Sequence, residues 1–136
     1  MDLVVDANVL IAAIISPTGH TADLFFSERL QLYAPDFLLE EIEEHKTEII
    51  DKAGLSEINF EQVLVSLALR LKFVSVEELL AIIPTAKEIS PDVDDLAYFA
   101  LALKLDCSLW SNDKKLKEQK RVKVFSTLEL LELLKN

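Results

Sequence analysis

The sequence predicts an α/β sandwich in which helices cover both faces of a parallel sheet. Short stretches of strand character alternate with helical stretches along the chain. The strand stretches are apolar rather than alternating with polar residues, which is typical of strands covered on both faces. The chain has 136 residues, of which 51% are hydrophobic and two are Gly, so it can bury a core without disulfide or metal staples. We therefore expect a single domain over residues 1–136.

Strand and helix signals follow one another in the first half of the chain. The opening run Leu3-Val4-Val5 is a strand, and the stretch after it is too long and too rich in Ala to continue that strand. A long helix opens after Pro35 and closes at Gly54, as helix boundaries commonly do. The expected elements are strands at residues 3–5 and 32–33 and helices at residues 9–15, 21–28, 36–53 and 56–72.

The second half continues the same alternation. Pro84 should interrupt the helical stretch in which it lies, because proline has no main-chain N–H to donate. The helix that begins near Asp92 is apolar on nearly all sides, which places it in the interior. The expected elements are strands at residues 73–76, 107–110 and 122–125 and helices at residues 77–89, 92–105, 114–119 and 127–135.

Cysteine content, hydropathy and the opening residues exclude several classes of protein. The single Cys107 and only two histidines leave no disulfide framework and no Cys/His zinc site, which fits a reducing, cytoplasmic setting. The apolar opening lacks a basic region and is interrupted by Asp2, Asp6 and Asn8, so it does not read as an export signal. The longest apolar run, residues 96–103, is too short to span a membrane. We expect a cytoplasmic protein with no membrane association.

The charge is acidic overall and unevenly distributed. A formal net charge of −10 argues against unassisted binding to a polyanion, so a phosphate substrate would need cations as intermediaries. Six of the 14 Lys and Arg residues nevertheless lie between residues 114 and 123. This cluster is either a solvated helix face or a local patch that steers anions, and both interpretations stay open.

Carboxylates follow two of the expected strands. Asp6 comes directly after the first strand, and Asp113 comes three residues after the fourth. Because ligands bind beyond the carboxyl ends of the strands in a parallel sheet, both should lie on the same rim. Asp92, Asp94 and Asp95 crowd the start of the apolar helix, so at least one of them should face the same region. Each Asp taken alone also fits a helix N-cap.

Helix geometry selects a fourth acidic residue. At about 100° per residue, Leu38, Ile42 and Ile49 mark the buried face of the helix that opens after Pro35. Glu41 lies at the edge of that face, which makes it the glutamate best placed to point inward, with a solvated position as the alternative. The three glutamates nearest to it in sequence fall well outside the apolar arc: Glu40, Glu43 and Glu44.

These motifs together resemble the PIN domain, the nuclease fold of VapC-type toxins, of RNA-processing endonucleases and, more distantly, of 5′-flap nucleases. The resemblance covers nearly the whole chain and implies a three-layer α/β/α fold with a parallel sheet of about five strands. It rests on four motifs in the family's order: VVDANV with Asp6 and Asn8, Glu41-Ile42 with Glu40 as the rival register, DVDDLAYFALAL with Asp95 as the core position, and LWSND with Ser111 and Asp113.

The resemblance implies a metal-dependent nuclease that hydrolyses RNA phosphodiesters. Asp6, Asp95 and Asp113 would bind one or two Mg²⁺ or Mn²⁺ ions, and Glu41 would bind metal or orient the attacking water. Physical chemistry agrees, since converging carboxylates need a counter-charge and Mg²⁺ prefers oxygen ligands. Asn8 and Ser111 would hydrogen-bond a metal-bound water or a substrate phosphate, and Asp92 or Asp94 would support the metal ligands from behind. The candidates for binding the nucleic-acid backbone are Lys114, Lys115 and Lys117.

The resemblance to toxins also implies an antitoxin protein as a partner. The C-terminal stripe Leu128, Leu131 and Leu134 is typical of a core-facing helix and would also serve an interface with an antitoxin or a second copy. We therefore expect a homodimer or a higher oligomer in addition to the RNA substrate.

Two other classes of function remain. A PIN fold that no longer cleaves would act as an RNA-binding or protein-interaction module. A phosphoacceptor domain or a haloacid-dehalogenase-like phosphatase also has an Asp after its first strand, but such a phosphatase needs a second Asp two positions on, where Asn8 stands. Metal binding by the free protein, lost on removal of one carboxylate, would discriminate the nuclease from the non-cleaving module.

Overall fold

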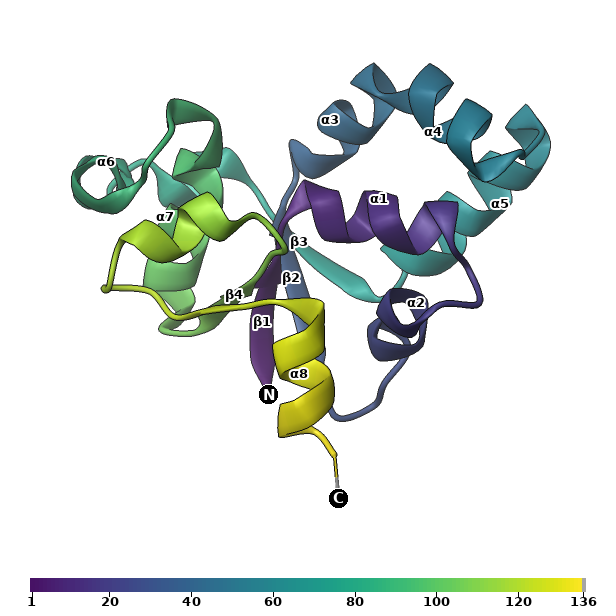
Figure 1. The fold of residues 1–136 in the computed structure, drawn as a ribbon. Coiled ribbons are helices and arrows are strands. Elements are labelled where there is room, and N and C mark those ends of the chain that lie inside the picture. Colours follow the sequence, from purple (N-terminus) through teal and green to yellow (C-terminus); the bar gives the residue numbers. More distant parts are fainter. Residues whose placement is uncertain (136) are drawn as a thin grey trace.

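A five-stranded sheet in the order β3-β2-β1-β4-β5 forms the centre of the computed structural model, which describes residues 1–135 (Figure 1). Every pair of neighbouring strands is parallel, and β1 is the central strand. The predicted α/β fold with a parallel sheet of about five strands is confirmed. The strands are β1 (Asp2–Val5), β2 (Gln31–Pro35), β3 (Leu71–Val74), β4 (Ser108–Trp110) and β5 (Val124–Phe125).

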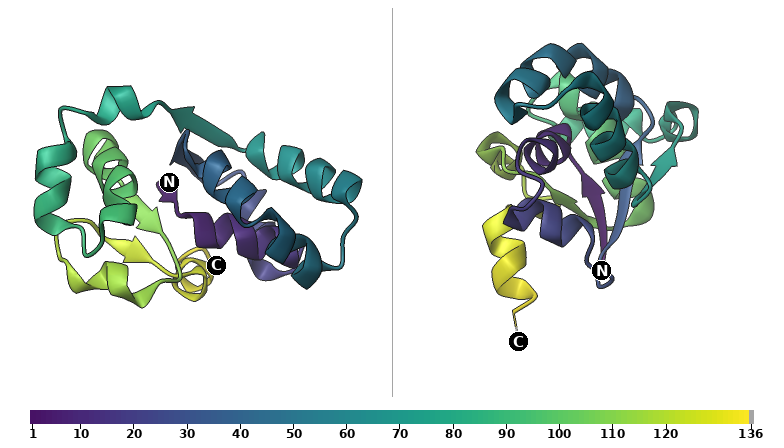
Figure 2. Two further views of the ribbon diagram at one scale, coloured as in Figure 1. Left: turned by 90° about the horizontal axis from the view of Figure 1, so that it is seen from above. Right: turned by 90° about the vertical axis from the view of Figure 1, so that its right-hand side faces the viewer.

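Helices cover both faces of the sheet, which gives the three layers expected of the fold. Figures 1 and 2 show α1 to α5 on one side of the sheet and α6 and α7 on the other, while α8 contacts α2 and β5. The α-helices are α1 (Ala7–Ile15), α2 (His20–Phe25), α3 (Leu38–Glu44), α4 (Lys46–Ala53), α5 (Glu57–Ala68), α6 (Ile83–Ile89), α7 (Leu96–Leu105) and α8 (Thr127–Leu133). The described 3₁₀ helices are η1 (Val76–Leu79), η2 (Val93–Asp95) and η3 (Lys114–Glu118).

The hydrophobic core extends across the sheet. Leu3, Val4 and Val5 of β1 are fully buried, because this strand has neighbours on both edges and helices on both faces. Helix α7 contacts β1, β2 and β4, and residues 98–102 within it are buried, as expected of an interior helix. Within residues 1–135, no helix combines the length and the hydropathy that crossing a membrane requires.

The long helix expected over residues 36–53 is divided into α3 and α4, which corrects the prediction. His45 lies between the two helices with φ −102° and ψ 9°. Its main-chain N–H donates to the carbonyls of Glu41 and Ile42, so the last turn of α3 tightens and the helix ends. Hydrophobic periodicity does not reveal this break, because Ile42 of α3 and Ile49 of α4 are both buried.

The strand expected at residues 73–76 occupies Leu71–Val74 instead, because the helix before it ends early, at Ala68. Arg70 accounts for the difference. Its guanidinium donates to the main-chain carbonyl of Phe25 at 2.9 Å and to two carbonyls of the loop before β2. These bonds tie the turn between α5 and β3 to the end of α2, so the helix cannot continue to residue 72.

The expected interruption near Pro84 is present, because η1 ends at Leu79 and α6 begins at Ile83. Pro84 lies in the first turn of α6, where no N–H donor is needed, so it helps to start this second helical segment. One further boundary differs for a local reason. β5 begins at Val124 and not at residue 122, because the side chain of Gln119 binds both the N–H and the carbonyl of Val122 at 2.8 Å. The other expected elements are present with small shifts at their ends.

Candidate functional site

Two neighbouring strand ends bring the first acidic residue next to a serine. β1 and β4 are paired with Val5 opposite Trp110, and both strands end at the same edge of the sheet. The residues that follow, Asp6 and Ser111, are therefore neighbours in space. The main-chain N–H of Asp6 donates to the carbonyl of Trp110 at 3.0 Å, which extends the pairing by one residue.

Asp6 is buried, and three hydrogen bonds hold its carboxylate. Oδ1 accepts from the main-chain N–H of Ala7 at 2.8 Å, while Oδ2 accepts from Ser111 Oγ at 2.7 Å and from Asn8 Nδ2 at 2.9 Å. Burial raises the pKa of Asp6 and the charge of Asp113 adds to this, although the three hydrogen bonds lower it. Asp6 therefore caps α1 and presents fixed oxygen atoms at the rim of the sheet.

Ser111 connects Asp6 with Asp113. The Ser111 hydroxyl donates to Asp6, and it accepts from the main-chain N–H of Asp113 at 3.1 Å and from Asn8 Nδ2 at 3.2 Å. The exposed Asp113 carboxylate accepts from the N–H of Lys115 at 3.0 Å, so it caps η3. One network thus joins Asp6, Asn8, Ser111 and Asp113, which the sequence analysis had grouped from two separate motifs.

The three aspartates before α7 have different environments. Asp92 caps η2 by accepting from the N–H of Asp94 at 3.1 Å, and both residues are exposed. Asp95 is partly buried, and its side chain makes no capping hydrogen bond to α7. Burial raises the pKa of Asp95 to about 6, together with the charges of Asp6, Asp92, Asp113 and Asp94. Asp95 is therefore coupled to the rim, whereas Asp92 serves as a cap.

Glu41 is turned toward α7, and Glu40 is exposed to solvent. The Tyr98 hydroxyl donates to Glu41 Oε1 at 2.9 Å. Burial raises the pKa of Glu41, and the charges of Asp6, Glu44 and Asp94 act in the same direction, while the hydrogen bond from Tyr98 lowers it. Glu41 is thus partly buried between α3 and α7, and its charge is coupled to that of Asp6.

A cavity of about 580 Å³ opens beside Glu41, between α3 and the segment from η1 to α7. Acidic and apolar side chains share its walls, so it offers both charge and an apolar surface next to the carboxylates. Its lining consists of Phe37, Glu41, Glu44, His45, Val76, Ile83, Val93, Asp94, Leu96 and Ala97.

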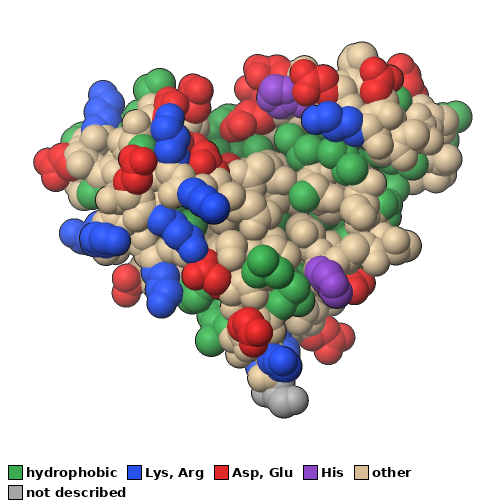
Figure 3. Space-filling model, viewed as in Figure 1, with side chains coloured by type: hydrophobic (Ala, Val, Ile, Leu, Met, Phe, Trp, Pro, Cys, Tyr) green, Lys and Arg blue, Asp and Glu red, His purple; other side chains and the backbone are tan. Residues whose placement is uncertain are grey.

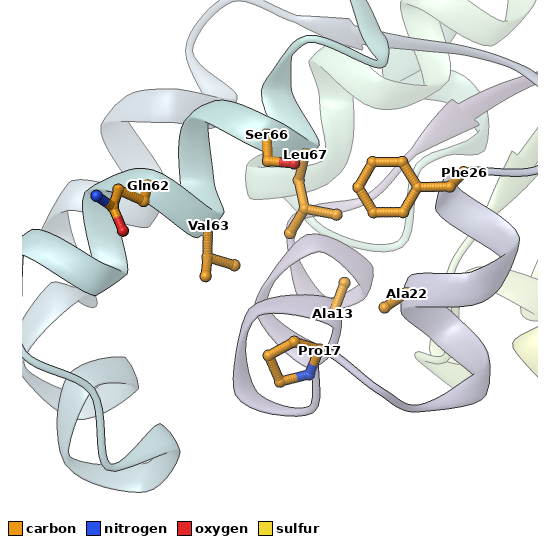
Figure 4. Close-up of a pocket in the computed structure, with 8 residues that line it drawn as sticks. All are labelled: Ala13, Pro17, Ala22, Phe26, Gln62, Val63, Ser66 and Leu67. Carbon is orange, nitrogen blue, oxygen red and sulfur yellow. The ribbon is translucent and has the colours of Figure 1, made fainter.

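A second cavity, of about 230 Å³, lies among α1, α2 and α5 (Figure 4). The figure shows Phe26, Leu67 and Val63 around it, and its walls contain no carboxylate. This cavity is an apolar recess and lacks the groups that acid–base or metal chemistry requires. The carboxylate rim is therefore the better candidate for a reactive site.

The four site carboxylates are Asp6, Glu41, Asp95 and Asp113. Within residues 1–135, no three His, Cys, Asp or Glu side chains are arranged, as they stand, to hold a metal ion. The donors nevertheless fit Mg²⁺ or Mn²⁺ chemically, because all are carboxylate oxygens whose mutual repulsion a cation would neutralise. Mg²⁺ also needs only one or two carboxylates from the protein when water and substrate phosphate complete its shell.

Lysine side chains follow the last site carboxylate. Lys114 and Lys115 are exposed directly after Asp113, whereas the ammonium of Lys117 pairs with Glu129 of α8 and lowers the pKa of Glu129 to about 2. Figure 3 shows Lys and Arg side chains gathered on the left of this face, over the segment that contains η3. A basic patch therefore lies beside acidic side chains, and Lys117 of this patch is paired with Glu129.

A family model described as the PIN domain matches residues 4–130. The chain belongs to the PIN domain family. The match spans all four site carboxylates and confirms the resemblance inferred from the motifs. No match was found among curated proteins.

The fold of this PIN domain is also similar to a solved structure. That structure is a crystal structure of VapBC2 from Rickettsia felis bound to a DNA fragment from their promoter. The similarity has a TM-score of 0.67 at 14% sequence identity and covers 93% of this chain and 98% of that chain. At this level of identity, the similarity concerns the fold.

The structure adds three residues that the sequence analysis did not select. Tyr98 contacts Glu41, as described above. Asn112 accepts from the N–H of Thr127 at 2.8 Å and donates to Thr127 Oγ1 at 3.1 Å, and its own N–H donates to Asn8 at 3.3 Å. In this PIN domain, Asn112 therefore links the rim to the start of α8. The position of Asn112 inside the LWSND motif was a usable signal, whereas nothing local marked Thr127.

Proposed function

We propose that this PIN domain is a metal-dependent nuclease that hydrolyses RNA phosphodiesters. The main support is the electrostatic coupling of the site carboxylates. The charge of Asp113 raises the pKa of Asp6 and of Asp95, and the charge of Asp6 raises the pKa of Glu41 and of Asp95. Such a group is costly unless a cation neutralises it, and metal-assisted hydrolysis is the chemistry that uses this arrangement. Family membership supports the same reaction class.

Asp6, Asp95 and Asp113 would hold one or two Mg²⁺ or Mn²⁺ ions in this proposal. A bound divalent ion activates water and neutralises charge that develops at the phosphorus during displacement. Glu41 would complete the shell or orient the attacking water. Ser111 and Asn8 hold Asp6 through its Oδ2 atom, so positioning this carboxylate is the part of their expected role that the hydrogen bonds support.

The substrate backbone would lie along the basic side of the site. Lys114 and Lys115 are exposed next to Asp113 and would attract phosphates through the electrostatic term that dominates nucleic-acid binding. Lys117 would have to leave Glu129 before it could contribute. Asp92 and Asp94 would act behind the ligands, as a cap and as nearby negative charge.

We also propose that the chain acts as the toxin of a toxin–antitoxin pair. The support is the similarity of its fold to a structure described as VapBC2. An antitoxin protein as partner, a homodimer or higher oligomer, and a cytoplasmic location all belong to this proposal.

A non-cleaving PIN domain is the second candidate function. The observation that favours it is that no three potential ligand side chains within residues 1–135 are arranged as they stand to hold a metal. In that case the chain would bind RNA or protein without hydrolysis.

Cleavage of a mixed set of structured and single-stranded RNAs separates the two candidates. We expect wild-type protein to cleave with Mg²⁺ or Mn²⁺ and not with EDTA, and we expect Asp6→Asn and Asp113→Asn to be at least about 100-fold slower. Glu41→Gln should be impaired while its neighbour Glu40→Gln, which alters an exposed side chain, keeps wild-type activity. An inactive wild type would establish the non-cleaving module instead, whereas full activity of both Asp variants would show that Asp6 and Asp113 are not the catalytic carboxylates.

A further inference from the structure

We propose that Tyr98 is a positioning residue that holds the Glu41 carboxylate at the edge of the metal site. This inference rests on the proposed function, because it assigns a role within that site. Tyr98 would contact neither metal nor substrate and would act through Glu41.

Tyr98 is itself fixed in place. Only 1% of its surface is exposed, and it lies near the start of α7, the interior helix. Its ring contacts the ring of Phe37 edge to face, with the centroids 5.4 Å apart. The hydroxyl is therefore a donor with little freedom to move, aimed at Glu41 Oε1 at 2.9 Å.

Glu41 takes its hydrogen bond from a single side chain of another element, which sets it apart from Asp6 and Asp113. Asp6 has three donors, and Asp113 has a main-chain donor from its own capping turn. Among residues 1–135, Tyr98 provides the only hydrogen bond to the Glu41 carboxylate, which leaves Oε2 available to a ligand.

The Glu41 side chain has room for a second orientation, because open space lies beside its carboxylate. The charges of Asp6 and Asp94 repel it, and Glu41 also lines the cavity of about 580 Å³ between α3 and α7. Without the Tyr98 hydroxyl, no hydrogen bond among residues 1–135 would hold the carboxylate against rotation into this open space. The hydroxyl therefore opposes the rotation that would remove Glu41 from the site.

Tyr98 also positions the helix that bears Glu41. Phe37 is the residue just before α3, a helix of seven residues that lacks a side-chain cap at its start. The contact between the Tyr98 and Phe37 rings therefore anchors the beginning of α3 against α7. Replacement of Tyr98 by Phe separates the two effects, because it keeps the ring contact and removes only the hydroxyl.

The test measures Mn²⁺ binding, by the loss of the free-ion electron paramagnetic resonance signal, in wild type, Tyr98→Phe and Tyr33→Phe. Tyr33 on β2 is the matched control, since it is the other tyrosine and takes no part in the hydrogen bonds of the site. We expect Tyr98→Phe to weaken Mn²⁺ binding about tenfold, as removal of an outer partner of a metal ligand typically does, and Tyr33→Phe to leave it unchanged. Thermal unfolding of each variant verifies that it is folded during the measurement.

A double-mutant cycle shows whether Tyr98 acts through Glu41. In a Glu41→Ala background, Tyr98→Phe should have no further effect on Mn²⁺ binding, whereas a general structural role would weaken binding by the same factor in both backgrounds. Equal binding by Tyr98→Phe and Tyr33→Phe, or an undiminished effect in the Glu41→Ala background, would overturn the inference alone. A wild type that neither binds Mn²⁺ nor cleaves RNA would overturn the proposed function and this inference with it.

Discussion

At the scale of single residues, hydrogen bonds show that three of the aspartates near the site cap a helical segment and that Asp95 does not. Asp6, Asp92 and Asp113 each accept a main-chain N–H at the start of a helical segment. Asp95 does not, although it is the residue directly before α7. No capping bond therefore offsets the cost of burying the Asp95 carboxylate. Of the four aspartates, Asp95 is the one whose negative charge most opposes folding when no cation is bound.

Replacement of Asp95 by Asn should stabilise the metal-free protein at neutral pH. The pKa of Asp95 is about 6 in the folded state, against about 3.9 in an unfolded chain, so the folded state binds more protons between these values. Stability therefore falls as pH rises from about 4 to about 6 and stays lowered above that range. We expect Asp95→Asn to gain roughly 1 kcal/mol at pH 7, after allowance for partial solvation, and much less at pH 4.

Urea unfolding in EDTA at the two pH values checks this effect. Asp92→Asn is the matched control, because asparagine caps a helix about as well as aspartate, and it should change stability little at either pH. A destabilised Asp95→Asn variant at pH 7 would show that the Asp95 carboxylate contributes favourable contacts to the metal-free fold, contrary to our interpretation.

At the scale of elements, α8 is attached to the site through its first turn. Ser126 and Glu129 form a capping box, and Asn112 adds a bond from outside the helix to the N–H of Thr127. Thr127 Oγ1 also accepts from the indole N–H of the buried Trp110 at 3.1 Å. The loop that holds Ser111 and Asp113 is thus fastened between β4 and α8.

Replacement of Asn112 by Ala should loosen that attachment. It removes the acceptor for the Thr127 N–H and the donor to Thr127 Oγ1, and we expect a loss of about 1 to 2 kcal/mol in unfolding free energy. Hydrogen exchange at the Thr127 amide should accelerate in parallel. Asn112→Asp keeps an acceptor for this amide and should retain more protection than Asn112→Ala, whereas equal protection in all three proteins would contradict the proposed attachment.

The elements also show which boundaries a sequence can predict. Apolar runs located all five strands to within a few residues, because most residues of the strands are buried. The edge strand β3, in which Lys72 is exposed, lies two residues earlier than expected. The break at His45 and the early end of α5 were missed. Both depend on contacts that hydrophobic periodicity does not encode: a change of main-chain angles at one residue, and the reach of Arg70 to carbonyls of another segment.

At the scale of the whole molecule, a net charge of −10 and four coupled carboxylates make divalent cations the expected stabilising partners. Mn²⁺ at about 100 times its dissociation constant should add about 2.7 kcal/mol to the unfolding free energy, which corresponds to a rise of several degrees in the melting temperature. Potassium chloride at the same ionic strength controls for general screening. Asp6→Asn should lose most of the Mn²⁺ effect, and an equal rise with potassium would argue against a specific site.

The sequence alone determined the class of fold, because strand burial and helix periodicity are local features of the chain. Its four motifs carried the resemblance to the PIN domain family and selected the candidate residues of the site. Only the tertiary structure decided the strand order, the different roles of Asp92 and Asp95, and the long-range pairs Tyr98–Glu41 and Asn112–Thr127. Glu41 and Tyr98, 57 residues apart, meet because α3 follows the end of β2 and α7 packs against β1 and β2. Such packing depends on the shape of the whole core rather than on any one segment.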